Sequence, residues 1–158
     1  DNSYKCSVHM PVPSRIDTVT FSDGSIFPVV HFPGVDHIIC LTDSEDTLCG
    51  DGKDLETDRQ EYEAKVKEYC REMGSLCTGM MIFDKNTGVL NPLVYVPGAD
   101  TIFWEHSCAS GTTALGAWLA SSEASVPLEA IIHEPGGDLA ISVNLSGQLV
   151  LKGSVRFI

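Results

Sequence analysis

Short segments of the chain alternate between apolar and polar residues or consist of a continuous apolar run. Both patterns predict β-strands, the first half-buried and the second fully buried. The predicted strands lie near residues 5–10, 16–22, 25–32, 36–41, 77–83, 89–96, 127–133, 138–145 and 148–157. The turn at 22–25, Ser-Asp-Gly-Ser, separates two of them as a hairpin turn would. The pattern therefore predicts a chain made mostly of strands.

Residues 59–73 show a helical pattern instead. Their apolar positions recur on one face of a helix: Tyr62, Val66, Tyr69, Cys70 and Met73. Asp58 and Glu61 form a capping-box pattern at the start, and Gly74 supplies a stop. A single apolar stripe predicts a helix on the surface of the sheet, with a structural role.

A second helix is expected to begin near Ala109. The run 114–120, Ala-Leu-Gly-Ala-Trp-Leu-Ala, is apolar or small on nearly every face, which is typical of a helix buried on all sides. Many strands and one buried helix predict an α/β (α+β) fold. We expect a barrel-like, mostly antiparallel sheet wrapped around this central helix, in a single domain over residues 1–158.

Composition narrows the classes of function. The 158 residues are 43% hydrophobic and carry a formal net charge of -12, which argues against a nucleic-acid partner. No apolar run is long enough to span a membrane, and the polar first residues show no signal peptide. We expect a cytoplasmic domain cut from a longer protein. The acidic segment 43–58 lacks the residue order of a calcium loop and is expected to be a solvated loop.

Six cysteines are present, but no C-x-x-C pair suggests a zinc site. Most of them have apolar neighbours, as Cys40 does, so we expect free buried thiols in a reducing compartment and no metal.

Cys108 is the exception, because it stands at a strand-to-helix junction. Ala109, Ser110 and Gly111 follow it, and such small residues let a ligand approach the backbone. The first turn of a helix offers unpaired N–H groups and a positive dipole end, which favour a carboxylate. The same field is expected to lower the pKa of the Cys108 thiol.

Three interpretations of Cys108 remain open. It can be a buried structural thiol, or a nucleophile with His106 as its base. It can also be an acid/base group that moves the Cα proton of an amino acid whose carboxylate sits in the helix cradle. Inversion at Cα then requires a second group on the opposite face.

The segment 107–111, Ser-Cys-Ala-Ser-Gly, resembles the A-C-G-[ST]-G motif of the diaminopimelate epimerase superfamily of cofactor-independent racemases and epimerases. Residues 134–142 and 148–153 resemble the end of these proteins, and Gly34-Val-Asp-His37 resembles their G-N-P-H segment. The likeness covers nearly the whole chain.

The resemblance implies one half of an enzyme with two similar halves, each a sheet around a helix with one catalytic cysteine and without cofactor. It assigns this chain to the C-terminal half and Cys108 as the second cysteine. The partners are then a small amino-acid substrate, the missing N-terminal half and, for the whole enzyme, a second copy. The candidate substrate-binding residues are Ser107, Ala109, Ser110 and Gly111 of the motif, together with Glu105 and His37. Two alternatives stay open: Glu105 can orient an amino group or be a solvated strand residue, and His37 can bind substrate or be a structural histidine.

Departures from the motif bear on substrate and activity. Ala109 replaces a glycine, Val35 replaces a substrate-binding asparagine, and Ala99-Asp100 replaces a Glu-Arg pair, so diaminopimelate is expected to be a poor substrate. The pattern 104–108, Trp-Glu-His-Ser-Cys, is more similar to the histidine racemases of the superfamily. We expect Trp104 and His106 to form a pocket for a flat, neutral or weakly basic side chain. The alternative is an inactive binding subunit that retains the fold.

Overall fold

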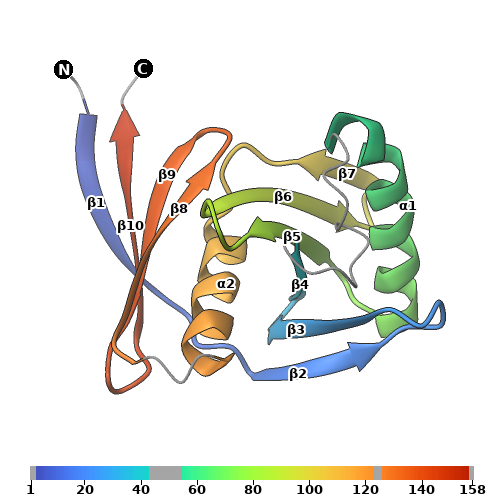
Figure 1. Cartoon of the computed structure of the whole chain (residues 1–158), viewed down its shortest axis with the longest axis horizontal. Helices are drawn as coiled ribbons and strands as arrows, with labels where there is room; N and C mark the ends of the chain where they lie inside the picture. Colours follow the sequence, from blue (N-terminus) through green and yellow to red (C-terminus); the bar gives the residue numbers. More distant parts are fainter. Residues whose placement is uncertain (1–2, 43–54, 123–125, 157–158) are drawn as a thin grey trace.

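The computed structural model describes residues 3–42, 55–122 and 126–156. Within these ranges, two helices pack against one sheet (Figure 1). The helices are α1 (Leu55–Met73) and α2 (Ala109–Ser122). The strands are β1 (Ser3–Met10), β2 (Arg15–Thr20), β3 (Ile26–Phe32), β4 (Val35–Leu41), β5 (Thr78–Asp84), β6 (Val89–Val96), β7 (Thr101–Trp104), β8 (Leu128–Glu134), β9 (Gly137–Val143) and β10 (Leu149–Arg156).

The sheet is mostly antiparallel, as the sequence predicted. Its strand order is β1-β10-β9-β8-β6-β5-β4-β3-β2, and only the pairs β4·β5 and β6·β8 among the described strands are parallel. The sheet forks at β6, which pairs with β8 at Val89 and with β7 along 93–96. Strands β1 and β2 stand at the two ends of this path, so the sheet curls without closing into a barrel.

Helix α2 lies inside the curl of the sheet and packs on strands from both of its ends (Figure 1). Its residues 111–117, 119 and 120 are all buried, which confirms the prediction of a central helix. The side chains around it, among them Ile39, Leu90 and Ile141, form one hydrophobic core. Gly116 permits this packing, because a Cβ there would lie 2.4 Å from Cγ1 of Ile141.

Helix α1 covers the opposite face of the sheet, as its single apolar stripe predicted. Tyr62, Val66 and Tyr69 are buried in a second core on that side. The Tyr69 hydroxyl and Lys65 Nζ each donate a hydrogen bond of 2.8 Å to Oδ2 of Asp23 in the β2–β3 turn. The Lys65 contact holds the pKa of Asp23 well below its usual range.

Three sequence-based expectations need correction. Helix α1 begins at Leu55, so Asp58 lies inside it and caps nothing. For the same reason residues 55–58 are not part of a loop, while 43–54, with Cys49, lie outside the described residues. Strand β7 was not predicted. Neither described helix is long and apolar enough to cross a membrane.

Candidate active site

Cys108 is the N-cap of α2. Its carbonyl accepts the first helical hydrogen bond, from Thr112 N at 2.9 Å, and its Sγ accepts one from Gly111 N at 3.3 Å. A Cβ on Gly111 would lie 2.2 Å from Sδ of Met81 and 3.0 Å from the Cys108 Sγ, so only glycine fits there. Tight packing and a local hydrogen bond therefore hold the thiol at the start of the helix, where it is 4% exposed.

The structure reverses the expected protonation of Cys108. Burial, a hydrogen bond with the Glu105 side chain and the charge of Glu105 raise the pKa of the thiol to about 12. The hydrogen bonds from Gly111 N–H and with Ser110 act in the other direction and are outweighed. The prediction of a lowered pKa is wrong because it considered the helix end without the desolvation and the neighbouring carboxylate. Cys108 is therefore a thiol in this structure.

Two carboxylates flank Cys108. Glu105, half-buried, contacts the sulfur, whereas Glu134 at the end of β8 contacts the backbone. Oε2 of Glu134 accepts a hydrogen bond of 3.0 Å from Cys108 N, and Oε1 accepts one of 2.6 Å from the Thr112 hydroxyl. Glu134 is 7% exposed, and this burial raises the pKa of its carboxyl.

The turn after β8 is also hydrogen-bonded to the loop that precedes Cys108. Gly136 N donates a hydrogen bond of 2.6 Å to the carbonyl of His106. A Cβ on Gly136 would lie 2.8 Å from that oxygen, so the close approach requires glycine. Glu134 was not predicted as a site residue, because the run 134–138, Glu-Pro-Gly-Gly-Asp, falls in the segment that resembles the family's ending. A glutamate directly before a Pro-Gly-Gly turn was the available signal.

The expected substrate-binding residues divide into two groups. Glu105, Ser107, Ala109, Ser110 and Gly111 surround Cys108, with Ser107 and Ala109 exposed. A cavity of about 290 Å³ opens beside Ser110. Apart from Ser110 and Thr113, its lining is apolar: Met10, Pro11, Phe32, Pro33 and Val35.

His37, the sixth expected residue, is inside the protein. It is 0% exposed, and neither ring nitrogen has a hydrogen-bond partner among the described residues. A Cβ on its strand partner Gly79 would lie 2.3 Å from Nδ1 of His37 and 2.8 Å from Cε of Met81. Burial lowers the pKa of His37 to about 4, so the ring is neutral. Met81, which also packs at Gly111, links this ring to the Cys108 site.

Trp104 does not face Cys108, contrary to expectation. Its indole N–H donates a hydrogen bond of 2.8 Å to Oε1 of Glu63, and the Arg59 guanidinium lies 5.1 Å from the centre of the ring. Both partners belong to α1, so Trp104 is part of the packing on the outer face of the sheet. The expected pocket of Trp104 and His106 is therefore not formed. The Cys108 sulfur also has other partners than His106, because its hydrogen bonds go to Glu105, Ser110 and Gly111.

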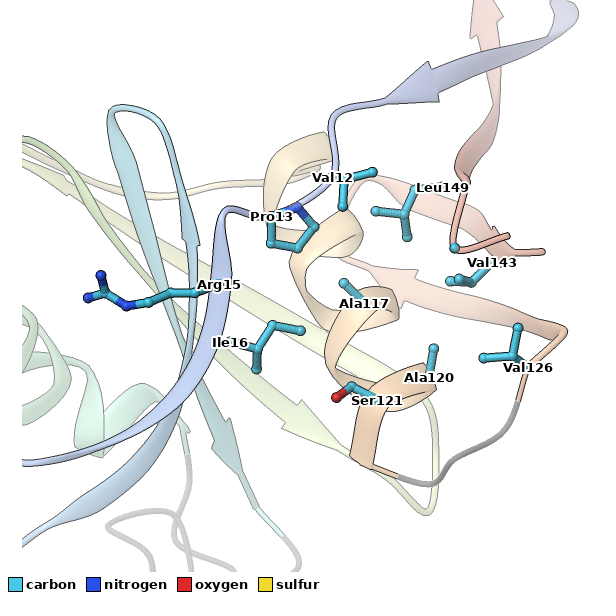
Figure 2. A pocket seen from close by; sticks show the side chains of 11 residues that line it. Val12, Pro13, Arg15, Ile16, Ala117, Ala120, Ser121, Val126, Val143 and Leu149 are labelled. Atoms are coloured by element: carbon cyan, nitrogen blue, oxygen red, sulfur yellow. The ribbon is translucent and has the colours of Figure 1, made fainter. Parts of the chain in front are cut away.

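Another hollow, also of about 290 Å³, lies by the C-terminal half of α2 (Figure 2). Its lining is mostly apolar, and the Arg15 side chain points away from the other labelled residues, toward its ion-pair partner Asp17 at 2.8 Å. It offers no acid or base to a ligand. Among the described residues no group of three or more His, Cys, Asp or Glu is arranged to hold a metal ion.

Comparison with known proteins identifies the family. A family model described as the histidine racemase CntK N-terminal domain matches residues 1–157. The chain belongs to this family. The chain is 31% identical over 94 residues to a histidine racemase of Staphylococcus aureus, covering 60% of the chain and 34% of the relative. It is 29% identical over 119 residues to a histidine racemase of Fusobacterium nucleatum, covering 75% and 41%. The chain thus spans less than half the length of these relatives.

A solved structure shows the same fold. A hydroxyproline epimerase from Agrobacterium vitis, with bound trans-4-hydroxy-L-proline, matches 99% of this chain and 52% of its own, with a TM-score of 0.55 and 10% identity. The resemblance to the epimerase superfamily is thereby confirmed. The family model, however, describes an N-terminal domain, whereas the motifs predicted the C-terminal half. The predicted placement of the chain in the C-terminal half is therefore contradicted by the family model.

Proposed function

We propose that this domain is one catalytic half of a cofactor-independent amino-acid racemase, with Cys108 as its acid/base group. The observation that carries the proposal is a buried cysteine thiol at the N-cap of α2, hydrogen-bonded to the Glu105 side chain. Helix geometry leaves the N–H groups of Ala109 and Ser110 without an intrahelical acceptor, and these suit the α-carboxylate of a substrate. A proton donor and a carboxylate site thus lie side by side at the start of the same helix.

The protonation of Cys108 supports a part for it in the reaction. As a buried thiol hydrogen-bonded to the Glu105 side chain, it serves as the proton donor in the direction that begins from this state. A base on the opposite face of Cα, a cysteine of the complementary half, removes the Cα proton, and Cys108 then delivers its own proton to the other face. The two cysteines end with exchanged protonation states, and the reverse reaction begins from there.

The surroundings of the thiol favour a substrate without an acidic side chain. Glu105 lies at the thiol, and an acidic side chain would bring a second substrate carboxylate toward it, in addition to the α-carboxylate that the helix N–H groups hold, and would be repelled. The cavity beside Ser110 is lined mostly by apolar groups and suits a neutral side chain. Since relatives of this domain are named histidine racemases, we propose histidine as the first candidate.

The same proposal includes the partners and the compartment. The complementary half of the same polypeptide supplies the second cysteine, and the whole enzyme can pair with a second copy. The described cysteines Cys6, Cys70, Cys77 and Cys108 are free thiols, which supports a location in the reducing cytoplasm.

Racemisation by the complete enzyme that contains this domain tests the proposal. L-histidine, other neutral and basic amino acids, and LL-diaminopimelate are offered in turn and followed by chiral chromatography. We expect histidine to be turned over best. Cys108→Ala should lower kcat by about 10²–10⁴-fold, because the acid/base group itself is removed. Cys6→Ala, at an exposed free thiol on β1, is the matched control and should retain activity. An unchanged kcat in Cys108→Ala contradicts the mechanism, and faster turnover of diaminopimelate than of histidine contradicts the substrate assignment.

A further inference from the structure

We propose that Glu134 is a positioning residue that fixes Cys108 in its reactive place, an inference that rests on the proposed function. Glu134 does this through the backbone, because its carboxylate holds the N–H of Cys108 while Glu105 contacts the sulfur. The β8–β9 turn thereby becomes part of the acid/base machinery, although it lies 26 residues further along the chain.

The need for Glu134 follows from the choice of residue at the N-cap. A helix start is normally capped by the side chain of Ser, Thr, Asp or Asn, whose oxygen accepts an N–H of the first turn. Here the cap is Cys108, and a thiol sulfur is a weak acceptor. An enzyme that places a cysteine at this position loses a strong cap and leaves the segment before the helix loosely held.

Glu134 compensates from a neighbouring strand. Its two oxygens reach the Cys108 N–H and the Thr112 hydroxyl, one turn apart on α2, and the Ser107 side chain adds a third hydrogen bond. A carboxylate at this place also interacts favourably with the positive end of the helix dipole. The cap is thus restored without the cysteine being replaced.

Gly136 adds a second hydrogen bond to the loop before α2. Its N–H binds the carbonyl of His106, two residues before Cys108, in the same turn that carries Glu134. The loop is then fixed on both sides of Ser107, and the direction of the Cys108 Cα–Cβ bond is set by the β8–β9 hairpin. Because Glu134 is 7% exposed and occupied by these partners, it acts through Cys108 and not on the substrate.

Two substitutions and two controls test the role in the complete enzyme. Glu134→Gln keeps the size of the side chain and removes the carboxylate, and Thr112→Val removes its hydroxyl partner at constant shape. Thr112→Ser restores the hydroxyl, and Glu129→Gln removes an exposed carboxylate from the same strand. For each variant, kcat and KM with L-histidine are measured, together with the rate at which iodoacetamide modifies Cys108, read by mass spectrometry.

We expect kcat and the alkylation rate of Cys108 to change in opposite directions. In Glu134→Gln, kcat falls about 100-fold because the thiol is misplaced. KM changes by less than about threefold, since the substrate contacts remain. Alkylation of Cys108 becomes faster as the loop loosens, while Cys40, 0% exposed in the outer core, stays unmodified. Thr112→Val shifts in the same direction, and Thr112→Ser and Glu129→Gln stay near the original enzyme.

Several results would overturn it. They are an unchanged kcat and alkylation rate in Glu134→Gln, an equal loss in Thr112→Ser and Thr112→Val, or modification of Cys40 together with Cys108, which marks general unfolding. If the unsubstituted enzyme racemises no amino acid, the proposed function fails, and the alkylation rates alone then decide whether Glu134 positions Cys108.

Discussion

At the scale of single residues, the protonation of Cys108 is decided by its immediate neighbours. Desolvation and the Glu105 carboxylate stabilise the thiol, and they outweigh the Gly111 N–H bond that stabilises the thiolate. A helix N-terminus therefore does not by itself produce a reactive thiolate. In the proposed function it provides the cradle for the substrate carboxylate, and the adjacent Glu105 carboxylate keeps the proton on sulfur.

This balance gives a pH-dependent prediction for Glu105→Gln. Since Glu105 raises the pKa of Cys108, its removal should lower that pKa from about 12, and the thiolate fraction at any pH below it should rise. Each unit of decrease increases the thiolate about tenfold at a fixed pH. The pH profile of iodoacetamide alkylation should shift toward lower pH. Glu61→Gln, on the exposed side of α1, serves as control. A profile that stays in place, or shifts upward, would show that Glu105 does not act on the sulfur.

At the scale of elements, the hydrophobic pattern of the sequence was sufficient to predict a helix and its burial where the pattern repeats within that helix. The all-round apolar pattern of α2 and the single stripe of α1 predicted their opposite places, inside the curl and outside it. Strand β7 was not predicted, because its four residues are too few to show an alternating pattern of apolar and polar residues. The start of α1 was missed because Asp58 and Glu61 mimic a capping box inside the helix.

The candidate site was predictable only in its local part. Cys108 and the small residues after it are contiguous in the sequence, and the motif identifies them. The contact of Glu134 with Cys108 depends on how β8 is placed beside α2, which spacing does not show. Trp104 was misplaced for a related reason: β7 ends at that residue, so the alternation of strand side chains could not be extended to His106 and Cys108.

The close packing of α2 against β9 gives a prediction for Gly116→Ala. Alanine would gain about 1 kcal/mol in helix propensity, but overpacking a core typically costs about 1–3 kcal/mol. Since the new Cβ would lie 2.4 Å from the Ile141 side chain, we expect a net loss of up to about 2 kcal/mol in the free energy of unfolding, measured by urea denaturation. Gly98→Ala, in open space, should change little. Gly116→Ala combined with Ile141→Ala should cost less than the sum of the two. Full additivity would mean that the contact does not limit packing.

At the scale of the whole molecule, the domain is an open sheet with one helix inside and one outside. Residues Ser3 and Arg156 are paired across β1 and β10, so the two described ends of the chain lie side by side (Figure 1). The domain holds a single cysteine at a helix N-terminus among the described residues, since Cys6, Cys40, Cys70 and Cys77 lie in strands, inside α1 or just before β5. In the proposed mechanism, one such domain supplies one acid/base group, on one face of a bound amino acid.

We therefore expect the domain on its own not to racemise amino acids. Inversion at Cα needs a base on one face and an acid on the other, and a cysteine fixed at the start of α2 cannot serve both faces. The isolated chain is incubated with L-histidine in heavy water, and products are followed by chiral chromatography and by mass spectrometry for deuterium at Cα. Slow exchange with retention of configuration is compatible with Cys108 acting alone, and it should disappear in Cys108→Ala. Formation of D-histidine by the isolated chain, at a rate that depends on Cys108, would show that this domain carries both groups and would refute the two-half mechanism.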